Sequence, residues 1–319
     1  MIDLAGTWSL SDESGEYRAD MAVPGDGISA LHAAGLIADP YWGQNEYGLR
    51  WISKRDWTIR REVALDRTDL ELVIDMLDTV AEVQVNGVTV LRADSMFRQQ
   101  RADVSRAAKV GANEIEITFR SPVLEAAARQ AAQPFYIPYS KNNCPIPNGN
   151  MLRKPQCDFG WDWNIALGGF GVWGAIRLEP KGPRISDILV GQTHGDGRVD
   201  VALTVQANTA EVTATLCNET QSAIVVDGVA RLVLTLRDPA LWWPAGLGAQ
   251  VLHDLVVTGG GARATRKIGL RDMALVSEPD AAGRSFGMRV NGRPVFARGA
   301  NWIPADALHG RITVDGVRG

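Results

Sequence analysis

Strict alternation of apolar and polar residues is the feature that most constrains the fold of this chain. Residues 81–86 and 114–119 each place apolar side chains at every second position, with polar side chains between them. A period of two is typical of a half-buried antiparallel strand. The dipeptide Asn86–Gly87 is followed by a further apolar run, 88–91, which indicates a type I′ hairpin turn. These segments therefore predict an antiparallel sheet.

A second set of alternating segments lies in the second half of the chain and predicts further strands. They are residues 199–205, 211–216, 231–236 and 250–257. Helical periodicity is limited to residues 28–34 and the alanine-rich stretch 123–132. Many short strands with few helices are typical of the mainly β class, and we expect β-sandwiches.

The cluster Pro180–Lys181–Gly182–Pro183 separates the two sets of strands. Neither a strand nor a helix tolerates such a cluster in its interior, so we expect a domain boundary there. The predicted domains are a β-sandwich at 1–182 and a second one, of immunoglobulin-like size, at 183–271. Residues 272–319 are too few to bury a core of their own, and we expect this tail to be held loosely.

Composition excludes several classes of partner. The 33 Lys and Arg residues and the 37 Asp and Glu residues leave a net charge of -4 without a long block of either sign, so we expect no nucleic-acid partner. No run of about 18 apolar residues suggests a membrane span, and the N-terminus does not read as a signal peptide. We therefore expect a soluble, cytoplasmic protein. Three cysteines and four scattered histidines favour neither a disulfide framework nor a metal site.

The segment 133–160 carries five prolines and no periodicity, and it runs into the sequence FGWDWN at 159–164. Loops longer than about 12 to 15 residues without secondary structure are usually functional or disordered. Disorder is disfavoured, because the aromatic rings at 159–164 would be costly to expose to water. Trp161 could pack on a sugar ring while Asp162 accepts hydrogen bonds from two hydroxyl groups. In the alternative interpretation the tryptophans pin the loop to the sandwich and Asp162 caps a turn.

Residues 153–163, RKPQCDFGWDW, resemble the R-K-x-Q-C-x-F-G-W-D-W motif of β-mannosidases, in the glycoside hydrolase clan that also holds β-galactosidases and β-glucuronidases. Other segments resemble this family in the same order along the chain. They are 4–8 (LAGTW), 23–25 (VPG), 34–46 (AGLIADPYWGQNE), 55–57 (RDW), 77–83 (LDTVAEV), 96–98 (MFR) and 299–306 (GANWIPAD). The resemblance covers nearly the whole chain. One departure is Asn164, where the family more often has glycine.

The resemblance implies a jelly-roll-like, sugar-binding-type β-sandwich and an immunoglobulin-like β-sandwich. At 272–319 it implies the start of a (β/α)8 barrel that is not completed in this chain, because such a barrel takes about 250 residues. It further implies an exo-acting hydrolase that removes terminal non-reducing β-D-mannose from a β-mannoside or oligosaccharide, by double displacement and without a cofactor. In the resembled enzymes a loop of the first sandwich reaches the mannose subsite. The resemblance therefore implies that Trp161 and Asp162 contact the sugar.

Asn301 and Trp302 are weaker candidates for sugar binding, because the resemblance places them on the first barrel strand, where tryptophans often fill the core. Both catalytic glutamates of the resembled enzymes lie on the barrel, beyond residue 319. We therefore expect this chain alone to be inactive, with the missing barrel as its partner. A catalytic pair drawn from Asp158, Asp162 and Glu46 is disfavoured, because nothing in the sequence separates their pKa values. The alternatives to the enzyme are a stand-alone carbohydrate-binding module and a purely structural β-sandwich fragment.

Overall fold

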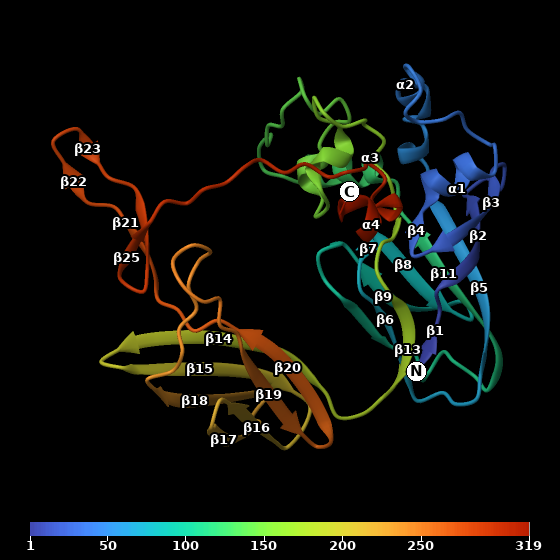
Figure 1. Cartoon of the computed structure of the whole chain (residues 1–319). Helices are drawn as coiled ribbons and strands as arrows, with labels where there is room; N and C mark the ends of the chain where they lie inside the picture. Colours follow the sequence, from blue (N-terminus) through green and yellow to red (C-terminus); the bar gives the residue numbers. More distant parts are fainter. Residues whose placement is uncertain (319) are drawn as a thin grey trace. The chain divides into compact units, whose positions relative to one another are not determined.

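The structure is a computed structural model that describes residues 1–318 and contains two units (Figure 1). The first unit consists of Met1–Lys181 together with residues 302–318, and the second consists of Gly182–Asn301. The division lies inside the proline-containing cluster at 180–183. The tail expected at 272–319 is not a segment of its own, because its first part belongs to the second unit and its last part to the first.

The first unit is a β-sandwich. Its larger sheet has six antiparallel strands in the order β3 (Arg18–Val23), β2 (Gly6–Asp12), β5 (Trp57–Leu65), β11 (Gly111–Phe119), β8 (Ala81–Val85) and β9 (Val88–Ala93). The other sheet has the order β1 (Ile2–Asp3), β13 (Ile176–Pro180), β6 (Leu70–Ile74) and β10 (Gln100–Asp103). A short third sheet joins β4 (Gly25–Asp26), β12 (Gly171–Val172) and β7 (Leu77–Asp78).

The alternation seen in the sequence corresponds to alternate burial along the strands of this sandwich. Every second residue of β8 is buried, and Val83 pairs with Ile117 of β11. Side chains of both larger sheets meet in one hydrophobic core, so each strand contributes one face to it. The predicted hairpin turn is confirmed, because Asn86 and Gly87 both have positive φ, 50° and 78°, as a type I′ turn requires.

Helices are short in the described part of the chain. They are α1 (Gly27–Ala33), α2 (Asn45–Leu49), α3 (Pro122–Ala131) and α4 (Val314–Arg318), with 3-10 helices at Ile52–Lys54, Gly149–Met151, Gln156–Phe159 and His309–Arg311. The two predicted helices are α1 and α3. Asp26 and Ser121 begin them, since each side chain accepts the backbone N–H three residues further on. Within residues 1–318, no helix combines the length and the apolar content needed to cross a membrane.

The second unit is a smaller β-sandwich. One sheet has the order β14 (Ile185–Gly195), β15 (Arg198–Ala207) and β18 (Val229–Arg237), and the other has the order β17 (Glu219–Ile224), β16 (Glu211–Leu216), β19 (His253–Gly259) and β20 (Ala262–Ile268). Val and Leu side chains of both sheets form its core. The strand expected at 250–257 begins only at His253, because Gln250 makes no more than an isolated bridge to Trp242.

Residues 272–301 add two small antiparallel sheets to the second unit. One joins β21 (Met273–Val276), β24 (Gly287–Val290) and β25 (Arg293–Val295), and the other joins β22 (Pro279–Asp280) and β23 (Gly283–Arg284). Residues 296–304 form neither strand nor helix. The expected barrel strand at Asn301 and Trp302 is therefore absent from the described part of this chain. A strand must pair its backbone groups with a neighbouring strand, and the described residues place none there.

Candidate functional site

A tight turn, Trp161–Asn164, ends the long loop of the first unit. The Trp161 amide donates to the Asn164 carbonyl (3.2 Å), and the Asn164 amide donates to the Trp161 carbonyl (3.3 Å). Asp162 and Trp163 therefore occupy the tip. Trp161 and Trp163 keep 40% and 38% of their surface exposed, and Asp162 is exposed as well. The two predicted residues, Trp161 and Asp162, are therefore both exposed on this turn.

The 3-10 helix Gln156–Phe159 holds one side of this turn. The Cys157 carbonyl accepts both the Gly160 amide (3.0 Å) and the Asn164 side-chain amide (2.8 Å). Gly160 has a φ of 109°, and a Cβ there would lie 2.5 Å from Pro145, so the position requires glycine. Asn164 departs from the family motif, and its side chain supplies a bond to the 3-10 helix that a glycine could not make.

Glu46, on α2, holds the other side. Its carboxylate accepts the Ala166 amide (2.9 Å) and lies 3.8 Å from Arg50 of the same helix. Asp158 is buried and forms ion pairs. Of the three carboxylates weighed as catalytic partners, Asp162 alone makes no hydrogen bond or ion pair within residues 1–318. Glu46 and Asp158 thus help to hold the loop, whereas Asp162 is exposed at the tip of the turn.

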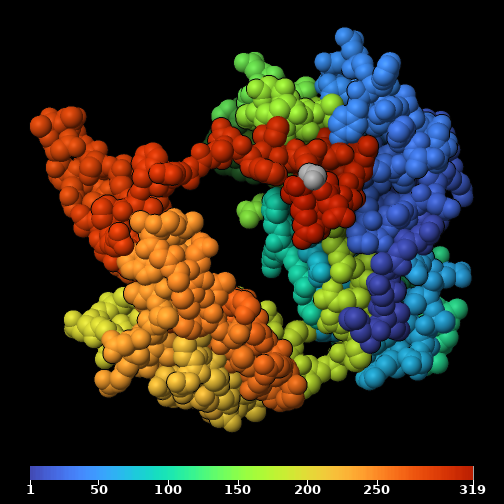
Figure 2. Space-filling view, in the orientation of Figure 1, coloured from blue at the N-terminus to red at the C-terminus, as the bar shows by residue number. Residues whose placement is uncertain are grey.

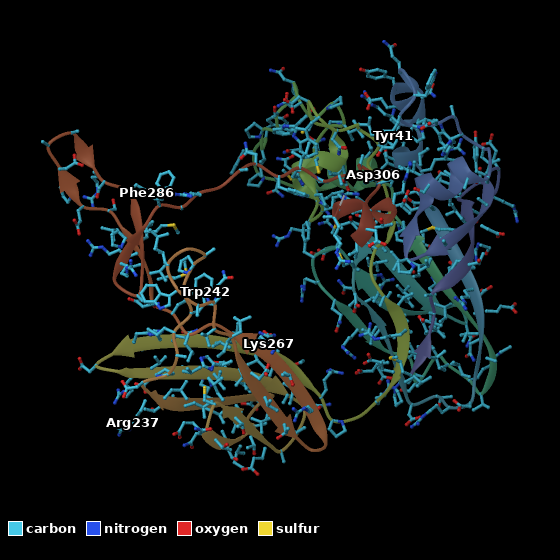
Figure 3. All side chains as sticks on the ribbon, viewed as in Figure 1. Tyr41, Arg237, Trp242, Lys267, Phe286 and Asp306 are labelled. Carbon is cyan, nitrogen blue, oxygen red and sulfur yellow. The ribbon has the colours of Figure 1, made fainter. Side chains whose placement is uncertain are left out.

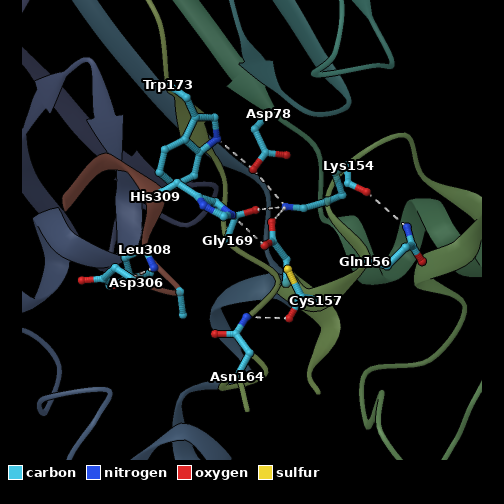
Figure 4. A network of polar contacts seen from close by, with 12 residues as sticks. Asp78, Lys154, Gln156, Cys157, Asn164, Gly169, Trp173, Asp306, Leu308 and His309 are labelled. Carbon is cyan, nitrogen blue, oxygen red and sulfur yellow. Dashed lines mark hydrogen bonds and ion pairs between the residues drawn. The ribbon is translucent and has the colours of Figure 1, made fainter. Parts of the chain in front are cut away.

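A buried network of charges anchors the 3-10 helix in turn (Figure 4). The Lys154 ammonium lies 3.0 Å from Asp78 Oδ2 and 3.2 Å from Asp158 Oδ2, and it donates to the Gly169 carbonyl (2.5 Å). The Trp173 indole N–H donates to the same Asp78 oxygen (3.1 Å). Asp78 ends β7 and Trp173 directly follows β12, so the short third sheet brings both residues to Lys154.

Burial governs protonation in this network. Burial raises the pKa of the Asp78 carboxyl to about 6, while the Lys154 ammonium opposes that shift and the Asp158 carboxylate adds to it. Burial also acts against the charged form of Lys154, but the two carboxylates raise the pKa of Lys154 above its ordinary value. Lys154 is therefore the cation of the network, and its three N–H donors meet three acceptors.

Most of this network was not predicted from the sequence. The four-residue spacing of Lys154 and Asp158 within the 153–163 motif is a signal that could have paired them. Asp78 lies 76 positions from Lys154, and His309, which contacts Asp158, lies 151 positions from it. Only the fold reveals these two partners.

Asn301 and Trp302, the weaker candidates for sugar binding, do not lie on a strand in the described part of the chain. Both are exposed in irregular chain, and Trp302 keeps 79% of its surface exposed, so it fills no core here. No hydrogen bond, ion pair or ring contact within residues 1–318 connects Trp302 to the turn, and Asn301 belongs to the second unit. In that same part of the chain, no three His, Cys, Asp or Glu side chains are grouped as metal ligands would be.

Comparison with known proteins identifies a family for this arrangement. The family model described as glycosyl hydrolase 2 galactose-binding domain-like matches residues 8–174. Two relatives are the β-mannosidase B of Emericella nidulans, 32% identical over 345 residues, and the β-mannosidase of Capra hircus, 30% identical over 367 residues. Each match covers 99% of this chain but only 40% of the relative. The chain thus spans well under half the length of the curated relatives that it matches.

Solved structures agree with the sequence relatives. The β-D-mannosidase from Dictyoglomus thermophilum superposes with a TM-score of 0.86 at 27% identity, over 99% of this chain and 42% of that one. The exo-chitosanase of Amycolatopsis orientalis shares the fold, with a TM-score of 0.65 at 17% identity over 96% of this chain and 37% of that one. The segment 8–174 contains the turn Trp161–Asn164 and makes up more than half of the chain. The chain therefore belongs to the glycosyl hydrolase 2 galactose-binding domain-like family.

Proposed function

We propose that this chain is the front portion of a retaining exo-β-mannosidase, a glycoside hydrolase that removes terminal non-reducing β-D-mannose. In this proposal the two sandwiches are a scaffold, and the turn Trp161–Asn164 contributes to the mannose subsite of a catalytic barrel. The relatives named β-mannosidase, which match 99% of the chain, support this assignment. It needs no cofactor, because retaining hydrolysis proceeds with two carboxyl groups.

The exposed Asp162 on a fixed turn is the observation that carries the proposal. A carboxylate accepts hydrogen bonds from two neighbouring hydroxyl groups, and an indole face packs against the C–H side of a sugar ring. Hydrogen bonds from both sides hold the turn, so a sugar that binds there orders few additional groups. Such preorganisation reduces the entropy that binding would otherwise lose.

The chain alone should not hydrolyse a β-mannoside. Retaining hydrolysis requires two carboxyl groups about 5 to 5.5 Å apart, one as nucleophile and one as acid. In the resembled enzymes both belong to the barrel, while in this chain Asp158 is bound by Lys154 and Glu46 by a backbone amide. We expect no turnover of an aryl β-mannoside above the rate of a mock preparation. Turnover that co-purifies with the chain and disappears in Asp162→Ala would contradict this expectation.

The substrate role of the turn is tested in a protein that carries the barrel after residue 319. Asp162→Ala should lower kcat/KM for an aryl β-mannoside roughly 10- to 150-fold, because hydrogen bonds to a charged group are worth about 1.5 to 3 kcal/mol. Its melting temperature should change little, since the carboxylate has no partner within residues 1–318. Trp161→Ala should lower kcat/KM as well, through the lost ring contact.

Asp66→Ala is the matched control, because Asp66 is an exposed aspartate in another turn of the first unit. It should leave both the melting temperature and kcat/KM unchanged. If Asp162→Ala instead melts many degrees lower while its folded fraction keeps normal kcat/KM, the turn has a structural role only. Asn301→Ala and Trp302→Ala test the weaker candidates in the same assay, with smaller losses expected.

A stand-alone carbohydrate-binding module is the second candidate function, favoured by the same exposed turn. A module must bind glycan without a barrel, whereas a partial subsite binds a sugar only weakly. Isothermal titration of the 319-residue chain with a β-mannoside oligosaccharide separates the two. Tight binding that Asp162→Ala removes would favour the module, and binding too weak to detect favours the front portion of an enzyme.

A further inference from the structure

The segment Asp306–Arg311 packs into the first unit rather than extending from it. Figure 2 shows the C-terminal residues, in red, seated on this unit, and Figure 3 shows Tyr41 close to Asp306. The Tyr41 hydroxyl donates to the Asp306 carboxylate and accepts the Ala307 amide (3.0 Å). Leu308 is only 3% exposed and belongs to the core of the first sandwich. The expectation of a loosely held tail is therefore wrong for this segment.

His309 caps the buried network. Its Nε2 lies 3.3 Å from Asp158 Oδ1, and its ring meets the Trp173 indole edge-on, with centroids 5.4 Å apart at an interplanar angle of 80°. The same indole donates to Asp78, so His309 contacts two members of the network directly (Figure 4). A hydrogen bond to Asp158 raises the pKa of His309 above its ordinary value, although burial opposes the shift.

The next residue, Gly310, allows this close approach. A Cβ at Gly310 would lie 3.2 Å from the Gly25 Cα and 3.6 Å from Asp26 Oδ2. Asp26 is buried, and its Oδ2 has no hydrogen-bond partner within residues 1–318. Burial raises the pKa of Asp26, while the positive charge of Arg311 acts in the opposite direction. The groups around His309 are thus the network carboxylates and Lys154, with Asp26 and Arg311 beside them.

Above the raised pKa of Asp78, about 6, both carboxylates are ionised, and the charges in the network then balance only when His309 is protonated. Asp78 and Asp158 bring two negative charges against the single positive charge of Lys154. An imidazolium at His309 supplies the missing positive charge. An uncompensated buried charge is strongly unfavourable, so docking of the segment Asp306–Arg311 and protonation of His309 favour one another.

Asp158 connects this network to the turn. It lies in the 3-10 helix Gln156–Phe159, whose Cys157 carbonyl holds both Gly160 and Asn164. The Asp158 carbonyl also accepts the Gly168 amide (2.8 Å), so the chain on the far side of the turn is tied to the same residue. A displacement of Asp158 would therefore move both ends of the turn.

We propose that His309 and Lys154 are positioning residues that act through Asp158 to hold the turn Trp161–Asn164 in one geometry while the segment Asp306–Arg311 is docked. The order of the turn then depends on the chain that follows the second unit. The inference rests on the proposed function only for what the turn binds. In a β-mannosidase it would make the sugar contact of the first sandwich conditional on the docked start of the barrel.

Hydrogen exchange read by mass spectrometry tests this in the 319-residue chain without any sugar. Protection of peptides spanning 157–166 and 305–311, corrected for intrinsic exchange, is measured at about pH 6 and about pH 8. In the wild type, both peptides should lose protection toward about pH 8, on the order of tenfold, as expected when one charge-assisted hydrogen bond is lost. His309→Gln should show the lower protection at both pH values. His194→Gln, in the second unit, should behave as the wild type.

Three results would overturn the proposal. Release of 305–311 with unchanged protection of 157–166 would show that the turn is not coupled to the segment. Wild-type protection in His309→Gln would show that His309 does not position the turn. A parallel loss of protection in β11 would mean general destabilisation rather than positioning. Because no sugar is present, a failed Asp162→Ala assay would leave this result intact, and the reverse also holds.

Discussion

Asp158 and Asp162 lie four residues apart in one loop, yet their surroundings are opposite. Asp158 is buried and faces the Lys154 ammonium and the His309 imidazole. Asp162 is exposed at the tip of the turn and has no partner within residues 1–318. A buried carboxylate must be paired, whereas an exposed one is free to bind a ligand. The loop is therefore divided into an exposed turn, Trp161–Asn164, and a buried anchor, which consists of Lys154, Asp158, Asp78, Trp173 and His309.

The anchor holds the loop in place of the backbone hydrogen bonds that a strand would provide. Residues 133–170 contain no strand, so no ladder of backbone hydrogen bonds fixes their position. The ammonium of Lys154 with its three acceptors fixes it instead, together with close contacts such as that at Gly149, where a Cβ would lie 2.3 Å from the Phe159 ring. These contacts hold the turn in place although the loop has no strand of its own.

The largest effect is expected from removing the cation of the anchor. Lys154→Met leaves Asp78 and Asp158 buried without their partner, and breaking a buried ion pair in this way costs about 3 to 5 kcal/mol. Chemical denaturation should show this loss in the free energy of unfolding. Lys181→Met is the control, because Lys181 pairs with Asp103 at the surface, and it should unfold like the wild type. Equal effects of both variants would contradict the role of Lys154 as anchor.

A smaller effect is expected where the anchor meets the turn. Asn164→Gly restores the residue more common in the resembled family but removes the 2.8 Å bond to the Cys157 carbonyl. The loss should lower the free energy of unfolding by about 0.5 to 1.5 kcal/mol, as typical for one hydrogen bond. Asn208→Gly, in the second unit, is the reference: it removes two side-chain bonds, one to the Gly182 carbonyl and one from the Arg184 amide, and should lower the free energy of unfolding by more. A stability unchanged by Asn164→Gly would mean that the turn is held by other contacts.

The pH dependence of the anchor should follow His309. Its pKa is raised in the folded chain, so its contribution to stability is complete below the unfolded pKa of about 6.5 and is lost as the pH rises through the folded value. Imidazole resonances in NMR should show His309 titrating above that unfolded pKa. Asp158→Asn should lower the pKa of His309, because it removes the carboxylate that the imidazole contacts. A His309 pKa below 6.5 in the wild type would contradict the charge balance of the network.

The smallest effect concerns the two parts of the tail. Phe286 and Phe296 are exposed in the second unit, whereas Leu308 is buried in the first. Brief chymotrypsin treatment should therefore cut near 286 or 296 before it cuts within 305–311 or within 72–119. The fragment that contains Leu308 should stay bound to the first unit after that cut. Early cleavage within 305–311 would show that this segment is not docked.

The strands could be predicted from the sequence because they depend on local patterns. Alternation along 81–86 and the Asn86–Gly87 dipeptide specify β8 and its hairpin without reference to distant residues. For Trp161 and Asp162 the residue types alone left both sugar contact and a structural role open, and sugar contact stays a prediction. The resemblance supplied the family, which the match over residues 8–174 confirms.

The anchor could not be predicted because its members meet only in the folded chain. Asp78 comes from β7 and Trp173 follows β12, and neither carries a local signal for a lysine far along the sequence. His309 lay in a tail that was expected to be loose. The barrel strand at Asn301 and Trp302 was predicted from the resemblance, and its pairing strands are absent from the described residues. Long-range contacts of this kind carry no period that a sequence can show.

One paired measurement tests the division between anchor and turn most directly. Asp158→Asn and Asp162→Asn make the same chemical change four residues apart, and both are assayed for melting temperature and for kcat/KM on an aryl β-mannoside in a protein that carries the barrel. Asp162→Asn should lower kcat/KM and keep the melting temperature, because it changes only the presented carboxylate. Asp158→Asn should lower the melting temperature clearly, because it removes a buried anion from Lys154 and His309. Loss of melting temperature in Asp162→Asn, with kcat/KM unchanged, would contradict the account.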